Sequence, residues 1–120
     1  MSMAAPPTGG SRLRMADLMP DAPARIEALI AAEIAAFDTS SPAARTTLAE
    51  FEAARIPPEP VEVQFSGAIH LDCWAVTRSN GRYTLVWMPL AGYFSLCVDG
   101  QFGPLDIGVH GPALGCFASV

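Results

Sequence analysis

Residues 83–98 carry no charged side chain, and this stretch constrains the fold more than any other feature of the sequence. It lies between Asn80-Gly81 and Asp99-Gly100, two dipeptides that favour tight hairpin turns because glycine and asparagine tolerate positive φ. Residues 1–60 hold five Arg and eight acidic residues, whereas residues 61–120 hold two Arg and four acidic residues. A sheet face open to water normally shows charged or strongly polar side chains. The second half is therefore expected to be a sheet that is buried on much of both faces.

The hydrophobic pattern predicts where the strands lie. From Val61 onward the pattern has a period of two, which is typical of a half-buried strand. Turns at residues 66–68, 80–81 and 99–100, with a weaker signal at 89–92, divide the second half into successive strands. Residues 115–120 follow Gly111 and Pro112 and are a candidate final strand. The sequence thus predicts an antiparallel meander of four to six strands.

The first half shows helical spacing instead. Residues 11–19 are expected to form a short helix that ends at Pro20. A second helix starts at Asp21 and runs to about residue 37, and a third starts at Ser41-Pro42 and ends before Pro57. The apolar stripe of the second helix contains Ile26, Leu29, Ile30, Ile34 and Phe37.

The expected architecture is an α+β fold in which two or three N-terminal helices pack on one face of the C-terminal meander. Residues 1–10 are expected to be a flexible tail, and residues 11–120 to form a single domain. This order of elements is similar to that of cystatin-like and nuclear-transport-factor-2-like α+β cones. The resemblance is one of element order alone, so it implies a curved sheet around a helix and assigns no function.

Short hairpin loops fix which residues share a face. Loops at residues 80–81, 90–91 and 99–100 pair Trp74 with Trp87, Trp87 with Phe94, and Phe94 with Leu105. The helix-facing side then collects the large apolar residues, namely Trp74, Val76, Tyr83, Leu85, Trp87, Phe94, Leu96, Val98 and Leu105. A turn at residues 66–68 is expected to add Val61, Val63 and Phe65 to this side. One continuous strand over residues 61–77 would instead place those three with Cys73.

The opposite face is smaller and mixed, but it also lacks charge, so it needs a cover. A partner subunit is the economical explanation. A late strand, formed by residues 105–110 or 115–120, that folds back over the face is the rival. The candidate interface consists of Ala75, Thr77, Thr84, Val86, Met88, Tyr93 and Phe102.

Glu33 is difficult to explain as a surface residue. On a helical wheel it falls between Ile26 and Leu29, so its carboxylate faces the sheet. A buried carboxylate in a cleft is a candidate general acid or base. The alternative is a Glu at the rim of the stripe that reaches solvent or pairs with Arg55.

His70 and Asp72 are two residues apart on one strand and therefore share a face. The expected register places them on the helix-facing side, near one end of the sheet. A histidine oriented by a carboxylate, with Glu33 nearby, suits proton transfer. Solvated polar side chains at a sheet end are the alternative. The candidate pocket comprises Glu33, Arg55, His70, Asp72, Trp74 and Trp87.

Several functional classes lack support. Cys73, Cys97, Cys116, His70 and His110 are zinc-competent types, but none forms a C-x-x-C or similar pair, so no metal site is predicted. The glycines at residues 108–111 lack phosphate-loop spacing, and no cofactor is expected. No Arg cluster marks a nucleic-acid surface on a chain of net charge −5. No stretch suggests a membrane span or a signal peptide, so a cytoplasmic protein is expected.

Two functional hypotheses follow. The first is a small acidic interaction protein without catalytic activity, either a homodimer or an adaptor, that uses the uncharged sheet face or an edge strand. The second is a small enzyme or ligand-binding protein with acid/base chemistry in a pocket between helix and sheet. The absence of a catalytic motif favours the first hypothesis. The sequence does not specify a reaction, a substrate or an oligomeric state.

Overall fold

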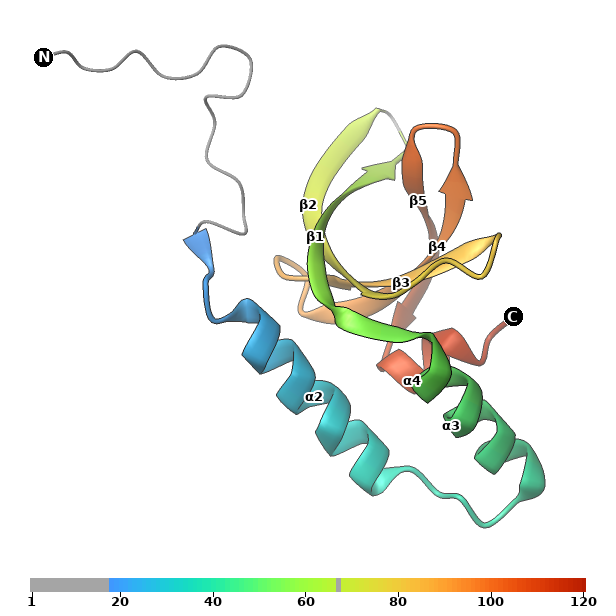
Figure 1. Cartoon of the computed structure of the whole chain (residues 1–120). Helices are drawn as coiled ribbons and strands as arrows, with labels where there is room; N and C mark the ends of the chain where they lie inside the picture. The colour runs from blue at the N-terminus through green and yellow to red at the C-terminus, as the bar shows by residue number, and fades with distance from the viewer. Residues whose placement is uncertain (1–17, 67) are drawn as a thin grey trace, which may run out of the picture.

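The computed structural model describes residues 18–66 and 68–120 (Figure 1). Within these residues the helices are α2 (Ala22–Ala36), α3 (Pro42–Ala54) and α4 (Ala113–Phe117). The strands are β1 (Arg55–Phe65), β2 (Ile69–Thr77), β3 (Tyr83–Met88), β4 (Tyr93–Gly100) and β5 (Gly103–Gly111). The predicted α+β class, with helices before strands, is confirmed. The expected tail at residues 1–10 lies outside the described residues, as does most of the expected helix at residues 11–19.

The two long helices start where the sequence predicts, but only one has the expected side-chain cap. Ser41 precedes α3 and its hydroxyl oxygen accepts a hydrogen bond from the Ala44 backbone N–H at 3.1 Å. Asp21 precedes α2, but its side chain makes no capping bond, and Pro23 in the first turn favours the helix start instead. No helix among residues 18–66 and 68–120 has the length and apolar character needed to cross a membrane.

The sheet is a closed barrel rather than an open meander. Its strand order is β1-β2-β3-β4-β5, with antiparallel neighbours, and β1 also pairs in parallel with β5 at Gln64 and Leu105. Register shifts occur in β1 between Arg55 and Glu59 and in β4 between Leu96 and Cys97. Bulges increase local twist and bend a strand, which allows a twisted sheet to close. The three helices lie together on one side of this barrel (Figure 1).

The two central hairpins have the predicted register. Trp74 pairs with Trp87, and Trp87 pairs with Phe94. Asn80 fixes the first turn, since its side-chain oxygen accepts hydrogen bonds from the backbone N–H groups of Arg82 and Tyr83. This local chemistry explains why the sequence pattern predicted these pairs.

The last hairpin differs from its prediction. Gly100 pairs with Gly103, so the loop consists of Gln101 and Phe102, not Asp99 and Gly100. Gly103 has φ +112°, a conformation that favours glycine. Two consequences of the displaced loop and the bulge are that Leu96 faces Val109 and that Phe94 faces Gly111.

The first hairpin has the expected turn but the wrong faces. β1 ends at Phe65 and β2 begins at Ile69, and these two residues pair. A loop with an odd number of residues pairs odd positions with odd positions, so Val61 faces Cys73. Val63 consequently packs beside Cys73 in the barrel interior. The prediction that Val61, Val63 and Phe65 share the helix-facing side with Trp74 is therefore wrong.

The fold has two hydrophobic clusters, one on each face of the curved sheet. The outer cluster joins the helices to the sheet and confirms most of the predicted helix-facing side. Leu105, which remains exposed, and Val98, which belongs to neither cluster, are exceptions. The buried members of this cluster are Ala22, Ile26, Ile30, Phe51, Trp74, Val76, Leu85, Phe94, Leu96, Ala113, Leu114 and Cys116.

The second cluster fills the barrel. It contains Val63, Cys73, Val86, Met88 and Cys97. Burial raises the pKa of the Cys73 and Cys97 thiols to about 12, and the nearby Asp106 carboxylate contributes to the rise. These cysteines are therefore packing residues held as neutral thiols.

Closure of the barrel corrects the expected interface. Ala75, Thr77, Thr84, Val86 and Met88 are buried within this chain, and Tyr93 is half-buried. Phe102 is exposed on the loop between β4 and β5. The strand β5 folds back and helps to cover the weakly polar face, which is the rival explanation from the sequence. A partner subunit is not needed to bury that face.

Residues 113–117 form a helix where a final strand was expected. Pro112 lies directly before α4, and proline cannot continue a paired strand because it has no N–H. The first free N–H groups of this helix donate hydrogen bonds to the Glu33 carboxylate on α2. The helix α4 packs under the sheet between α2 and α3 (Figure 1).

The open parts of the barrel edges are poor sites for adding another strand. β1 and β5 pair at one position, so other parts of both strands have an unpaired side. β1 carries Pro57, Pro58 and Pro60, which donate no backbone hydrogen bonds. β5 is irregular at Gly108, where φ is +81°. Prolines and bulges hinder edge-to-edge pairing, which disfavours an edge-strand contact.

Candidate functional site

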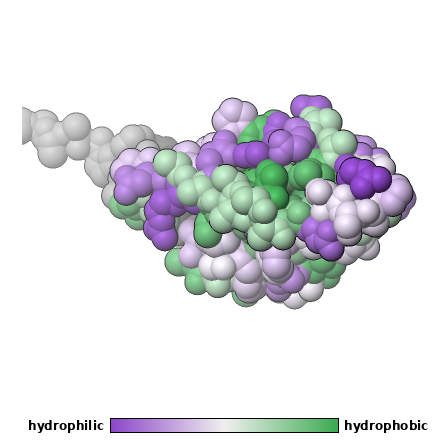
Figure 2. All heavy atoms as spheres, turned by 90° about the horizontal axis from the view of Figure 1, so that it is seen from below, coloured by the Kyte–Doolittle hydropathy of each residue, from purple (hydrophilic) through white to green (hydrophobic). Residues whose placement is uncertain are grey.

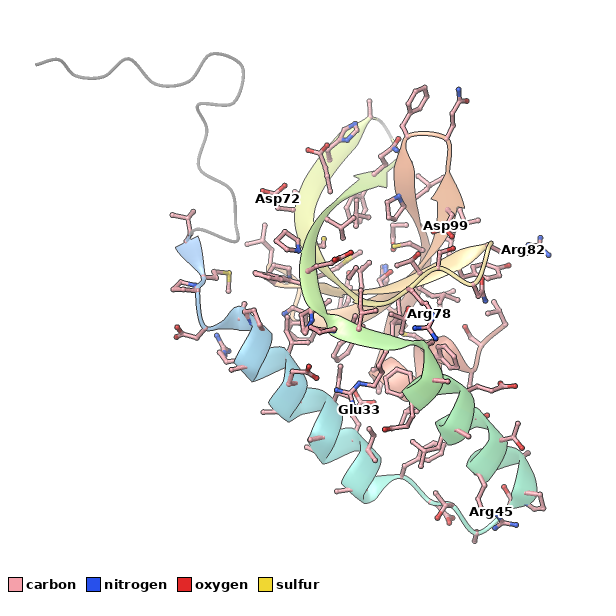
Figure 3. All side chains as sticks on the ribbon, viewed as in Figure 1. Glu33, Arg45, Asp72, Arg78, Arg82 and Asp99 are labelled. Carbon is pink, nitrogen blue, oxygen red and sulfur yellow. The ribbon has the colours of Figure 1, made fainter. Side chains whose placement is uncertain are left out.

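Glu33 faces inward, as predicted, but it serves a structural contact. Its Oε2 accepts a hydrogen bond from the Ala113 N–H at 2.8 Å, and its Oε1 accepts one from the Leu114 N–H at 3.1 Å. The first N–H groups of a helix lack partners within the helix, so a carboxylate there is favourable. Glu33 therefore attaches α4 to α2 (Figure 3).

Arg55 is not the partner of Glu33. Its guanidinium donates a short hydrogen bond to Glu27 and lies 3.8 Å from a Glu52 carboxylate oxygen. The same guanidinium lies 6.0 Å from the centre of the Phe51 ring. Arg55 thus ties the start of β1 to both long helices.

His70 and Asp72 lie on the outer side of β2, as expected, but beyond the part that the helices cover. The His70 Nδ1 is 3.6 Å from a Glu62 carboxylate oxygen on β1, and His70 is exposed. Glu33 lies on α2 beneath the barrel, whereas Asp72 lies on the wall of the barrel (Figure 3). The structure therefore does not assemble Glu33, His70 and Asp72 into one proton-transfer site.

The two tryptophans belong to the outer cluster, and of the predicted pocket residues the structure brings Glu33 and Trp87 to one open hollow along α2, without Arg55, His70, Asp72 or Trp74. Trp74 is buried, and its indole N–H makes no hydrogen bond to residues 18–66 or 68–120. Trp87 is half-buried and its ring centre lies 4.8 Å from that of Phe94. Both rings mainly join α2 to the sheet.

A polar cluster between β4 and β5 was not predicted from the sequence. The Ser95 hydroxyl donates to the Asp106 carboxylate at 2.5 Å, and His110 Nε2 lies 2.9 Å from the same carboxylate oxygen. The His110 ring stacks on the Tyr93 ring, with 4.4 Å between the ring centres. Only the bulge in this hairpin brings these residues together, so their spacing in the sequence is uninformative.

This polar cluster does not have the arrangement of a nucleophilic triad. In such a triad the serine donates to the histidine, and the carboxylate orients the histidine. Here Asp106 lies between Ser95 and His110, and Ser95 is fully buried. Within the described residues no group of three or more His, Cys, Asp or Glu side chains has a geometry suited to a metal ion. The cluster therefore fixes the bulged hairpin.

A cavity of about 340 Å³ lies between α3, the β2–β3 hairpin and the C-terminal region. Its floor is formed by Leu85 and Leu96, which are buried in the sheet. Phe117 of α4 contributes an aromatic wall. The complete lining consists of Glu50, Ala54, Thr77, Arg78, Asn80, Tyr83, Leu85, Leu96, Phe117 and Val120.

The rim of this cavity is held by the β2–β3 hairpin. The Arg78 guanidinium donates a short hydrogen bond to the Ala53 carbonyl near the end of α3. Asp99 accepts hydrogen bonds from the Ser79 and Thr84 hydroxyl groups, so the hairpin is also joined to β4. These bonds hold Arg78 and the hairpin in place before any ligand binds.

Two other hollows have larger volumes but are more open to solvent. One of about 610 Å³ lies at an end of the barrel beside Pro57, Pro58 and Pro104. Another of about 600 Å³ lies along α2 beside Leu29 and Trp87. The smaller cavity at α3 combines enclosure, an apolar floor and a polar rim, so it is the strongest candidate site.

Comparisons with known proteins add no family to this geometry: no family model matches the chain, and no curated protein and no solved structure shows significant similarity to it.

Proposed function

We propose that this protein binds a small organic molecule in the cavity between α3, α4 and the sheet. The observation that supports this proposal is the combination of a buried apolar floor with rim groups that have spare hydrogen-bonding capacity. Small-molecule sites are usually concave and mostly apolar, with a few polar groups that orient the ligand. A volume of about 340 Å³ is near the lower end of their usual range of roughly 300–1,000 Å³. The site thus suits a molecule of metabolite size.

The rim groups are available to a ligand. Neither the Tyr83 hydroxyl nor the Glu50 carboxylate makes a hydrogen bond or an ion pair with residues 18–66 or 68–120. Asn80 uses its side-chain oxygen in the turn, which leaves its amide N–H groups as donors. The second sequence hypothesis, a pocket between helix and sheet, is therefore retained with a different set of residues.

A larger side chain in the cavity is expected to abolish binding. Ala54 lines the cavity, so Ala54→Phe places a ring where the ligand would lie. An apolar fluorescent dye, anilinonaphthalene sulfonate, reports binding by its emission, and the Leu85 and Leu96 methyl signals locate the site by NMR with benzyl alcohol. We expect the affinity for both molecules to fall at least about tenfold, which equals about 1.4 kcal/mol.

Ala53→Phe is the matched control, because Ala53 is adjacent on α3 but exposed and outside the cavity. It should bind both molecules as the unmodified protein does. Equal losses in the two variants, or methyl signals of Leu85 and Leu96 that do not move on addition of benzyl alcohol, would contradict the proposed site.

The exposed side of α2 favours a second candidate function, self-association. The exposed residues of this helix include a single charge, Arg25, whereas a helix face in water is normally polar. Seen from below, residues of hydrophobic character form much of the middle of the surface (Figure 2). The uncharged exposed residues are Ala24, Ala28, Leu29, Ala31, Ala32, Ala35 and Ala36. Small residues let two helices approach closely, so this face suits a second copy of the chain.

Light scattering coupled to size-exclusion chromatography tests this candidate. At high micromolar concentration we expect the mass of a dimer, and Ala32→Glu should shift it to that of a monomer because two like charges would meet at the contact. Ala49→Glu on the exposed side of α3 is the control and should leave the mass unchanged. A monomeric mass for the unmodified protein would exclude self-association through α2.

A further inference from the structure

The charged groups at the cavity between α3 and the sheet have opposite signs and come from different walls. Glu50 lies on α3, whereas Arg78 lies at the start of the β2–β3 hairpin. No other lining side chain is charged. A ligand with one charge would satisfy one of these groups and be repelled by the other.

Hydrogen-bond donors gather on the hairpin wall. Arg78, Asn80 and Tyr83 all lie within this hairpin or at its ends, and each can donate to an oxygen atom. An Arg guanidinium forms short, directional bonds with a carboxylate. Because Arg78 is held by the Ala53 carbonyl, its orientation is fixed in advance. This wall therefore suits a carboxylate.

The α3 wall offers the opposite chemistry. Glu50 is the charged residue on this wall, and a carboxylate pairs with a cation or a hydrogen-bond donor. An ammonium group beside Glu50 would complement the carboxylate beside the hairpin. Both charged groups would remain near the solvated rim, where their desolvation is limited.

The floor determines the rest of the ligand. Leu85 and Leu96 are buried and Phe117 closes one side, so a charged or strongly polar side chain there would lose its hydration without a partner. We infer that the cavity binds a zwitterionic α-amino acid with an apolar side chain. The ammonium group contacts Glu50, the carboxylate contacts Arg78, Asn80 and Tyr83, and the side chain lies on Leu85 and Leu96. This inference rests on the proposed ligand-binding function.

Three related molecules test the inference by calorimetry and methyl NMR with the full chain. L-phenylalanine carries both charges, 3-phenylpropionate lacks the ammonium group, and 2-phenylethylamine lacks the carboxylate. We expect L-phenylalanine to bind at least about tenfold more tightly than either analogue, since each analogue leaves one rim charge without its partner.

Variants of the two rim charges should give opposite patterns. Glu50→Gln should weaken L-phenylalanine binding and should not weaken 3-phenylpropionate binding. Arg78→Gln should weaken L-phenylalanine binding and should not weaken 2-phenylethylamine binding. Arg45 lies at the far end of α3 (Figure 3), so Arg45→Gln is the control and should bind all three molecules as the unmodified protein does. Because Arg78 also bonds to α3, the Glu50 variant alone is sufficient to decide the outcome if Arg78→Gln does not fold.

The results separate the inference from the proposed function. If 3-phenylpropionate or 2-phenylethylamine binds as tightly as L-phenylalanine, the zwitterion inference is overturned and the ligand-binding function stands. If only benzyl alcohol moves the Leu85 and Leu96 methyl signals, the zwitterion inference is likewise overturned and the ligand-binding function stands. If none of the four molecules moves these signals, both fail.

Discussion

Phe51→Ala is expected to lower the free energy of unfolding by about 3–5 kcal/mol, the usual cost of removing a buried aromatic ring. Phe51 is the only buried residue of α3, and none of its surface is exposed. Its ring makes an edge contact with Phe117 of α4, with 5.3 Å between the ring centres. Without it, α3 retains few buried contacts with the rest of the protein. The variant should therefore also lose the α3 wall of the ligand cavity.

Urea unfolding followed by circular dichroism and tryptophan fluorescence measures this loss. Phe102→Ala is the matched control, since the same ring is 78% exposed on the β4–β5 loop. We expect the control to change the free energy by less than about 0.5 kcal/mol, as surface substitutions usually do. A cost below about 1 kcal/mol for Phe51→Ala would contradict the docking of α3 through this ring, because such burial normally contributes far more.

The parts of the fold that were predicted correctly depend on chemistry between neighbouring residues. Ser41 caps α3 through a bond to Ala44, three residues away. Asn80 orders a turn through bonds to the next residues, and that turn sets the Trp74–Trp87 register. Such signals are contained in a few residues, so one sequence is enough to detect them.

One error was local. The three-residue turn at residues 66–68 was expected, but an odd loop pairs odd positions with odd positions, so Val63 lies with Cys73 inside the barrel and not with Trp74. The other errors came from features whose effect depends on distant parts of the chain. Closure through Gln64 and Leu105 joins strands that are far apart in the sequence. The sequence pattern correctly showed that the second sheet face must be covered. It did not show that the chain covers this face itself.

The candidate site illustrates the same limit. The cavity forms where α3, the β2–β3 hairpin and α4 meet. Because a strand was expected at residues 115–120, the sequence did not predict that Phe117 would form a wall of the cavity. The residues chosen from the sequence were those with unusual positions in their own element. Glu33 was one of these, and its inward direction was predicted correctly. Its partners, the N–H groups of residues 113 and 114, were unrecognisable because they lie 80 and 81 residues away.

Glu33→Ala is expected to lower the free energy of unfolding by about 2–3 kcal/mol, because two bonds to a charged acceptor are lost and buried N–H groups remain without a partner. Ala113 and Leu114 are both buried, so water has limited access to replace the carboxylate. Glu33→Gln keeps one acceptor oxygen, so its free energy of unfolding should lie between that of Glu33→Ala and that of the unmodified protein. Glu27→Ala on the same helix is the control, since Glu27 contacts Arg55 near the surface and such pairs contribute roughly 0–1 kcal/mol.

The reactivity of Cys116 distinguishes local release of α4 from general unfolding. The Cys116 thiol is buried on α4 beside the Phe94 and Val109 carbonyl oxygens, and burial raises its pKa, so it should react slowly with Ellman's reagent in the unmodified protein. In Glu33→Ala, Cys116 should react faster while Cys73 and Cys97 remain protected inside the barrel. Equal acceleration of all three thiols would show that Glu33 supports the whole fold and not α4 alone. If none is accelerated, Glu33 does not hold α4 in place.

Local release would also move Phe117 away from the cavity, so the same variant should lose affinity for benzyl alcohol while its barrel stays folded.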